Sequence, residues 1–291
     1  MMLDIPVTST GLCLNYIDIN TIMNNLEKNL YFEKSNAISE HNYSDSSIIF
    51  AKHQSELLVQ DIRRDILKFY DKNIGYYVNL PIEDYREIVK NTQEFLNQKQ
   101  IAYLLCKCLK DQIKSYIQEN KFFIQTNLYL RATRPDVNMN TEKIGWHRET
   151  FYGPNMEKSV NIWTPILGVS ELNSLQYIPY SQNIPESEIV TVNTNDEVTS
   201  KGSTGNIIGF LYSPKEIISG VNLNNASKMI VPDFHSSIFS GLLIHGSGTN
   251  ESKNIRFSVD FRILPFSAYD STTSKQFHFA SKKPYFELFE D

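Results

Sequence analysis

The sequence predicts a mainly β protein preceded by helices, and two observations carry this prediction. Apolar residues recur at helical spacing through the first 120 residues, whereas after residue 121 they alternate with polar residues. Short extended runs separated by turn residues then favour a sandwich or a small barrel. The 291 residues suffice for one large domain or two small ones. We expect a single domain over residues 1–291, mostly helical in 1–120 and with a β core in 121–291.

Three amphipathic stripes predict the helices. We expect each stripe to pack against the β part, with a break between the first two at Leu80-Pro81. The stripes are Leu58, Ile62, Ile66 and Phe69; Tyr85, Ile88, Val89, Thr92 and Leu96; and Leu105, Cys108, Leu109, Gln112 and Tyr116. The stretch 35–47 is polar and is expected to be a loop.

Two alternating segments are the clearest strands. In 122–131 the polar positions include Gln125, Asn127, Tyr129 and Arg131, and in 255–263 they are Arg256, Ser258, Asp260 and Arg262. Shorter strand-like runs are 158–167, 206–212, 237–245 and 277–280. Half of such a strand usually faces water, but both polar sets lie next to candidate metal ligands. We therefore expect them to point into a barrel that holds a charged ligand. The polar segment 181–205 is a candidate mobile loop at the mouth of a site.

The chemistry centres on His147 and Glu149, which lie two residues apart in Gly-Trp-His-Arg-Glu, and on His245, 98 residues further on. Residues i and i+2 of a strand point to the same face, so one imidazole and one carboxylate can bind one cation. Two histidines and one carboxylate are typical of non-haem Fe(II) oxygenases. The other histidines carry no such pattern, and we expect them to be ordinary core or surface residues: His41, His53, His235 and His278.

Four motifs between residues 121 and 265 resemble the phytanoyl-CoA dioxygenase family of Fe(II)/2-oxoglutarate oxygenases. They are Gly-Trp-His-Arg-Glu at 145–149, Asn-Ile-Trp-Thr-Pro-Ile-Leu at 161–167, Leu-Gln-Tyr-Ile-Pro-Tyr-Ser-Gln at 175–182, and His-Gly-Ser-Gly-Thr-Asn-Glu-Ser at 245–252 followed by Arg256. The resemblance implies a double-stranded β-helix (a jelly-roll, cupin-like core) with N-terminal helices packed on one sheet. The chain departs from the family's pattern at Glu149, where the family has Asp, and at Tyr180 and Gln182.

The resemblance also implies the cofactors and their ligands. Fe(II) would be held by His147, Glu149 and His245, and the C5-carboxylate of 2-oxoglutarate by the guanidinium of Arg256. Reaction with O2 would release succinate and CO2. Further cosubstrate contacts are expected from Ser247, Asn161 and Gln125. For Arg256 the alternative is an ion pair with Asp260, which is also the expected partner of Arg262, and Arg148 is expected to point away from the metal.

The substrate is expected to be a polar small molecule that is hydroxylated. The polar lining favours it over a fatty acyl chain, and the candidate contacts are Asn127, Tyr129, Arg131 and Trp163. A weak resemblance to relatives in bacterial carbohydrate-biosynthesis clusters makes a sugar or nucleotide-sugar the first choice, followed by an amino-acid-derived metabolite. Two alternatives stay open, a cupin-like metal-dependent isomerase or hydrolase and a non-catalytic binding module on the same fold. The first would work with zinc and without oxygen, and metal content would reveal the second.

Composition excludes several other classes. The net charge of −5 gives no basic surface for nucleic acid. No apolar run approaches the length of a membrane span, and the N-terminus does not read as a secretory signal. Three cysteines, of which Cys106 and Cys108 diverge on a predicted helix, fit a reducing cytoplasm. The sequence leaves the oligomeric state open.

Overall fold

The computed structural model describes residues 47–135, 144–153, 156–193, 215–270 and 284–290, all of which belong to one unit, 37–291. The prediction of a single domain over 1–291 stays a prediction, because the first 46 residues lie outside the described part. The expected strands at 206–212 and 277–280 and most of the loop at 35–47 lie outside it as well.

Four helices precede most of the strands. They are α2 (Glu56–Leu67), α3 (Ile74–Val78), α4 (Ile82–Gln98) and α5 (Ile101–Ile117). Three of these helices correspond to the predicted stripes, whereas α3 was not predicted. The break at Pro81 is confirmed, since Pro81 is the N-cap of α4. The buried stripe of α4 contains Tyr85, Val89, Thr92 and Leu96 as predicted. In α5 the buried face is rotated from the predicted one, because Cys106 is buried while Cys108 is half-buried, and both are free thiols.

The larger sheet has seven antiparallel strands, and its longest strand is β11 (Arg256–Pro265). The order is β1 (Ile48–Lys52), β9 (His235–Ser240), β4 (Val160–Leu167), β11, β2 (Phe122–Gln125) and β12 (Phe286–Leu288), with β3 (Tyr129–Thr133) also paired to β11. The continuous strand predicted at 122–131 is wrong. The ladder is interrupted after Gln125, where Thr126 N–H donates to Tyr285 O and Leu128 N–H to Asn97 Oδ1.

Two smaller antiparallel sheets complete the described strands. The first consists of β10 (His245–Ser247), β5 (Leu175–Tyr177) and β8 (Ser227–Lys228), and the second of β6 (Val190–Asn193) and β7 (Lys215–Ser219). The strand predicted at 237–245 is therefore two strands, β9 and β10, in different sheets. The described part of 181–205 holds two short 3-10 turns and β6, and the rest of that segment lies outside the described residues.

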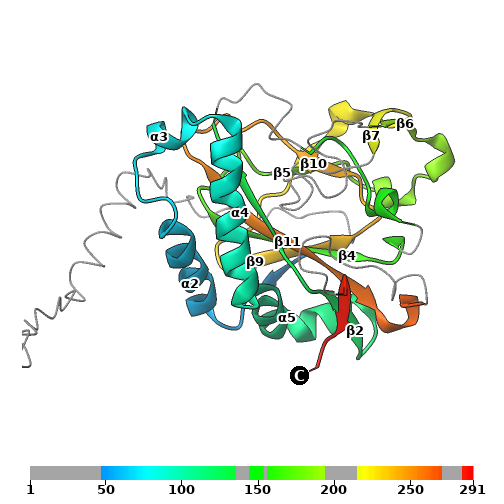
Figure 1. Cartoon of the computed structure of the whole chain (residues 1–291). Helices are drawn as coiled ribbons and strands as arrows, with labels where there is room; N and C mark the ends of the chain where they lie inside the picture. The colour runs from blue at the N-terminus through cyan, green and yellow to red at the C-terminus, as the bar shows by residue number, and fades with distance from the viewer. Residues whose placement is uncertain (1–46, 136–143, 154–155, 194–214, 271–283, 291) are drawn as a thin grey trace, which may run out of the picture. The chain divides into compact units, whose positions relative to one another are not determined.

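The helices pack against one face of the seven-stranded sheet (Figure 1), as predicted. The apolar residues of β11 supply part of this contact, and the ring of Phe257 meets that of Tyr70 edge-on with centroids 4.7 Å apart. Tyr85 of α4 reaches the edge strand β3, where its hydroxyl donates to Ala132 O over 3.0 Å. Each buried aromatic ring of this kind contributes about 1.5–3 kcal/mol through burial alone. The opposite, polar face of β11 is left to build the site.

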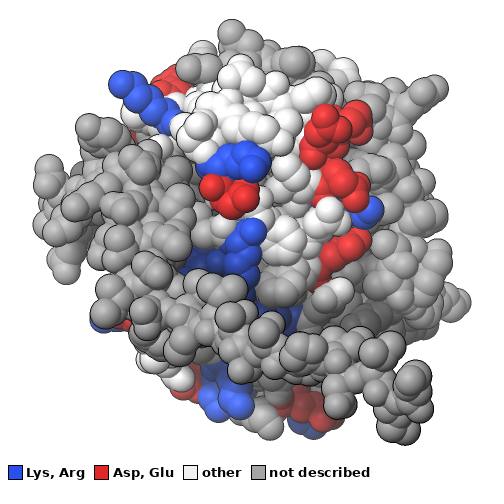
Figure 2. All heavy atoms as spheres, turned by 60° about the vertical axis from the view of Figure 1, so that its left-hand side comes forward, with Lys and Arg blue, Asp and Glu red and all other residues white. Residues whose placement is uncertain are grey.

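The surface gives no sign of a membrane span, because none of the described helices has both the length and the apolar character to cross a bilayer. On the face in Figure 2, the described basic side chains lie near acidic ones and among uncharged residues. The described part of this face is therefore of mixed charge.

Candidate metal centre

His147 and His245 are held opposite each other by the backbone. His147 N–H donates to His245 O over 3.0 Å, and His245 N–H donates to His147 O over 3.1 Å. Paired residues of an antiparallel ladder project to the same side, and the two imidazole rings accordingly lie 4.3 Å apart between centroids. The register of this short pairing thus brings together two residues that are distant in sequence.

Glu149 joins the two histidines through the local path of the chain. Arg148 is extended, with φ −126° and ψ 160°, so the side chain two residues after His147 returns to the same side. The chain then turns into the 3-10 helix Glu149–Tyr152, and Glu149 N–H donates to Gly241 O over 2.9 Å. One ligand atom from each of His147, Glu149 and His245 lies within 4.8 Å of the other two, and all three residues are buried.

The protonation state of this triad suits a cation. His147 Nδ1 lies 2.9 Å from Gly145 O and His245 Nδ1 lies 2.9 Å from Leu243 O. A carbonyl only accepts, so each Nδ1 carries the proton and each Nε2 offers a lone pair. Burial and the neighbouring His245 lower the pKa of His147 to about 3, and burial also lowers the pKa of His245. The residues therefore fit a divalent metal of the Fe(II) type.

Glu149 is ionised despite its burial because a cation lies against it. Burial raises the pKa of this carboxyl, but the charge of Arg262, its hydrogen bonds and the two neighbouring histidines together hold the pKa below its usual value. Arg262 Nε donates to Glu149 Oε2 over 2.9 Å and Nη2 donates to Oε1 over 3.1 Å. Arg262 also meets Asp260, as predicted, at 3.2 Å. Its contact with Glu149, which the sequence did not suggest, is bidentate.

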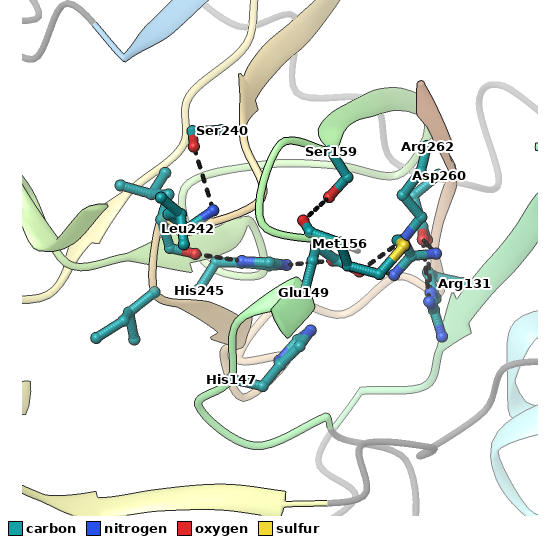
Figure 3. A network of polar contacts seen from close by, with 12 residues as sticks. Arg131, His147, Glu149, Met156, Ser159, Ser240, Leu242, His245, Asp260 and Arg262 are labelled. Atoms are coloured by element: carbon teal, nitrogen blue, oxygen red, sulfur yellow. Dashed lines mark hydrogen bonds and ion pairs between the residues drawn. The ribbon is translucent and has the colours of Figure 1, made fainter. Parts of the chain in front are cut away.

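The ion network continues beyond the metal ligands, as Figure 3 shows. Arg131 Nε donates to Asp260 Oδ1 over 2.6 Å, and its Nη2 donates to Oδ2 over 3.0 Å. The proposed contact of Arg131 with substrate must therefore coexist with this ion pair. Asp260 is shared between Arg131 and Arg262, and the alternative pairing of Asp260 with Arg256 is not formed among the described residues.

Arg256 is a buried cation that is held in place by neutral groups. Its Nη1 donates to Asn173 O over 2.8 Å and its Nη2 to Thr133 Oγ1 over 3.2 Å. Its Nε has no hydrogen-bond partner among the described residues. Burial, followed by the nearby charge of Arg131, lowers the pKa of Arg256 to about 10. A guanidinium in this condition is suited to an incoming carboxylate.

One cavity joins the triad histidines to Arg256. Its lining consists of Arg131, Ile144, His147, Asn161, Trp163, Leu175, Phe239, His245, Gly246, Ser247, Arg256, Asp260 and Arg262. The polar face of β11 thus points inward, as predicted. Arg131, Arg256 and Arg262 face two carboxylates, those of Glu149 and Asp260, so one positive charge is left over before any metal binds. This surplus favours an anionic ligand.

The lining includes five of the eight other predicted contact residues and leaves out three. Asn161 Nδ2 and Trp163 Nε1 are buried in the cavity wall without a hydrogen-bond partner among the described residues. Ser247, Arg131 and Arg256 line it as well. The lining does not include Gln125, whose Oε1 instead accepts from Arg262 N–H over 3.1 Å, and it does not include Asn127 or Tyr129. Direct contacts of these three residues with cosubstrate or substrate stay a prediction.

Several residues of the site were missed. Besides the pairing of Arg262 with Glu149, these are Thr133 and Asn173 beside Arg256, and Tyr152, whose ring meets His147 edge-on at 6.0 Å between centroids. A usable signal existed for Arg262, which lies six residues after Arg256 on the same face of one strand. Arg148 points away from the metal as predicted, and it donates to Ser181 O and Ile184 O.

Fold and site together define a protein with a centre of two imidazoles and one carboxylate in a β scaffold, the class of non-haem Fe(II) enzymes. The model of the phytanoyl-CoA dioxygenase (PhyH) family matches residues 26–258. The chain belongs to this family, and it is an Fe(II)/2-oxoglutarate-dependent oxygenase with the metal triad His147, Glu149 and His245.

Solved structures similar to this chain include three proteins of distant sequence. The epimerase SnoN, in complex with Fe3+, alpha ketoglutarate and nogalamycin RO, has 9% identity and a TM-score of 0.47, over 84% of this chain and 94% of SnoN. AviO1 from Streptomyces viridochromogenes Tue57 has 12% identity and a TM-score of 0.44, over 78% of this chain and 93% of AviO1. The carbocyclase SnoK from nogalamycin biosynthesis has 10% identity and a TM-score of 0.44, over 79% of this chain and 85% of SnoK. No curated protein gave a significant match.

Proposed function

We propose that this protein hydroxylates a polar small molecule and releases succinate and CO2 from 2-oxoglutarate. The observation that carries the proposal is that one cavity is lined by both triad histidines and by the buried Arg256, with Glu149 within ligand distance of the two histidines. Among the described residues, Arg256 has no carboxylate partner. A Lewis-acid isomerase or hydrolase would need the triad alone. The lone Arg256 favours the oxygenase, because it provides the cation that a dicarboxylate cosubstrate requires.

Each residue has a distinct task in this proposal. His147, Glu149 and His245 hold Fe(II), which with 2-oxoglutarate and O2 supplies the oxidising chemistry. Arg256 binds the far carboxylate of 2-oxoglutarate, and Asn173 O orients its guanidinium. Ser247 and Asn161 line the same cavity and are proposed to contribute hydrogen bonds to the cosubstrate. Burial of the triad keeps bulk water away from the reacting centre.

The substrate is proposed to be a sugar or nucleotide-sugar, with an amino-acid-derived metabolite as the second choice. Support comes from the polar character of the cavity, in which Arg131, Asn161 and Ser247 can meet hydroxyl or phosphate groups and Trp163 can pack on a ring. A fatty acyl chain would leave these buried polar groups without partners, which is costly.

The scaffold is proposed to be a double-stranded β-helix. The seven-stranded sheet and the sheet β10-β5-β8 would be its two halves, and the triad would span them, since His245 begins β10 while Glu149 is bonded to Gly241 next to β9. Antiparallel sheets on the C-terminal side of the helices support this proposal.

A succinate-release screen tests the function. Purified protein with Fe(II), ascorbate and 2-oxoglutarate is incubated in air with polar metabolites, nucleotide-sugars first, and succinate is measured against a reaction without metabolite. The proposal expects a metabolite-dependent rise in succinate together with a product 16 mass units heavier. Turnover that proceeds with zinc and without oxygen would support the isomerase or hydrolase instead. A protein purified without chelator that contains no metal and binds none would support the non-catalytic binding module.

A further inference from the structure

Glu149 has one more methylene than the aspartate that the family resemblance leads one to expect, and its carboxylate does not stand alone. Arg262 approaches it side-on, with Nε on Oε2 at 2.9 Å and Nη2 on Oε1 at 3.1 Å. Both side chains are almost completely buried, with 5% and 0% of their surface exposed. The pair therefore lies out of reach of solvent screening, where a two-point contact has a fixed geometry.

Arg262 is itself fixed from several directions. Its third guanidinium nitrogen, Nη1, donates to Asp260 Oδ2 over 3.2 Å, and its backbone N–H donates to Gln125 Oε1 over 3.1 Å. The rings of Tyr129 and Tyr152 lie 5.5 and 5.6 Å from its Cζ atom. The guanidinium is thus a rigid fork, to which the longer and more flexible side chain of Glu149 must conform.

The side-on contact has a consequence for metal binding. An ionised carboxylate has about four lone-pair sites, two on each oxygen. The two parallel N–H groups occupy one lone-pair site on each oxygen, on the side where both oxygens can bind a common partner. A cation bound to both oxygens would need the same two sites. One site remains on each oxygen, and Oε1 is the oxygen that lies 3.7 Å from His245 Nε2.

We propose that Arg262 is a positioning residue that makes Glu149 a one-oxygen metal ligand and so keeps a coordination position open for 2-oxoglutarate. The inference rests on the proposed function, since it concerns the same metal centre. Without the fork, the flexible glutamate is free to rotate and bind the metal through both oxygens. That arrangement fills a position that the cosubstrate needs. Arg262 therefore acts on cosubstrate binding through Glu149.

The experiment compares Arg262→Met with Arg131→Met. Both changes remove one guanidinium from the same ion network, but Arg131 donates to Asp260 whereas Arg262 donates to both oxygens of Glu149. Affinity for Mn(II) is measured by calorimetry, the coordination number by the absorption of the Co(II) form, and affinity for 2-oxoglutarate by the visible absorption of the anaerobic Fe(II) protein. Circular dichroism and thermal melting confirm that each variant is folded.

Arg262→Met is expected to bind metal, to show a Co(II) spectrum of different coordination, and to bind 2-oxoglutarate about 10- to 100-fold more weakly. Arg131→Met should keep the wild-type Co(II) spectrum. Arg262→Lys, which keeps the charge but offers no fork, should shift the spectrum in the same direction and serves if the Met variant does not fold. In the Glu149→Asp variant the shorter side chain does not reach the guanidinium of Arg262. Adding Arg262→Met to this variant should therefore change the affinity for 2-oxoglutarate much less than it does in the wild-type protein.

Two results would overturn the inference. Equal effects of Arg262→Met and Arg131→Met on the Co(II) spectrum and on 2-oxoglutarate affinity would mean that Arg262 only balances charge. Tighter metal binding with unchanged 2-oxoglutarate affinity would mean that it competes with the metal. Failure of the wild-type protein to bind Fe(II) and 2-oxoglutarate at all would instead contradict the proposed function, so the two failures are distinguishable.

Discussion

His147 and His245 exchange both of their backbone hydrogen bonds, at 3.0 and 3.1 Å, although 98 residues separate them. The metal centre is thereby built on the backbone register rather than on side-chain packing alone. A shift of one residue in this pairing would turn one imidazole to the opposite face. Gly241 also matters to the site, because its carbonyl accepts from Glu149 N–H over 2.9 Å and its N–H donates to Ser159 O over 2.8 Å.

The first prediction concerns the cosubstrate clamp. Arg256→Gln removes the buried cation that Asn173 O and Thr133 Oγ1 orient, so the KM for 2-oxoglutarate should rise about 10- to 100-fold, the effect of losing a hydrogen bond to a charged group. Metal affinity should stay close to the wild-type value because Arg256 contacts none of the triad. The measurement is succinate release at varied 2-oxoglutarate, with calorimetry of Mn(II) binding as the control. An unchanged KM would remove Arg256 from this role.

The second prediction concerns the turn that supports Arg256. Asn250 Nδ2 donates to Thr133 O and Asn254 O, and Asn250 Oδ1 accepts from Ser252. Asn250→Ala leaves these buried groups unpaired, which should lower the free energy of unfolding by about 1–3 kcal/mol and weaken 2-oxoglutarate binding by displacing Thr133. Urea titration and cosubstrate titration measure the two effects. Loss of stability with full cosubstrate affinity would show that the turn does not orient the clamp.

The third prediction tests the close packing behind Glu149. A Cβ atom at Gly241 would lie 2.3 Å from Ser159 Oγ, 2.9 Å from Ser159 O and 3.1 Å from Glu149 Cβ. Gly241→Ala should therefore displace Glu149 and weaken metal binding. The control is Gly75→Ala in helix α3, where the new atom meets only Asn73 Oδ1 at 3.3 Å. Calorimetry of Mn(II) should separate the two variants; equal affinities would contradict the packing that the structure shows.

The fourth prediction uses pH. Burial, followed by the charge of His235, lowers the pKa of His53 to about 4 from 6.5. Between these values the unfolded state binds more protons, so the contribution of His53 to stability is present above pH 6.5 and is lost as the pH falls toward 4. Between pH 7.5 and 5.0 this loss amounts to about 2 kcal/mol.

His53→Gln keeps a polar partner for Ser236 Oγ, which lies 2.9 Å from His53 Nε2, but it cannot titrate. Urea unfolding of both proteins at the two pH values isolates the effect of His53, because every other group is common to both. The wild-type protein should lose about 2 kcal/mol more than the variant. Parallel losses would show that His53 is not a buried neutral residue.

The sequence predicted those features that depend on residues close to one another along the chain. His147 and Glu149 could be recognised because two residues of an extended chain share a face, and the stripe of α4 could be recognised because its period is local. The partner of Arg262 could not, because Asp260 is two residues away on the same strand, whereas Glu149 is 113 residues away and is brought close only by the sheet. Charge partners across a fold depend on register, which periodicity does not encode.

The broken strand at 122–131 illustrates the same point. Phe122, Ile124, Leu128 and Leu130 all fall on even positions, so the alternation continues across the break between β2 and β3. The one irregularity is Thr126, a polar residue on the apolar series, whose hydroxyl and N–H bond Pro284 O and Tyr285 O. Its significance depends on the C-terminal strand, which carries no pattern of its own. The short strands β1 and β12 were missed for this reason.

The most direct test of the metal centre is an anaerobic titration of the purified, metal-free protein. Addition of Fe(II) and 2-oxoglutarate together should produce a visible absorption band that neither produces alone, and His245→Ala should abolish it because one of the three ligands is gone. A band of full intensity in His245→Ala, or none in the wild-type protein with both components present, would contradict the assignment of His147, Glu149 and His245 as the iron site.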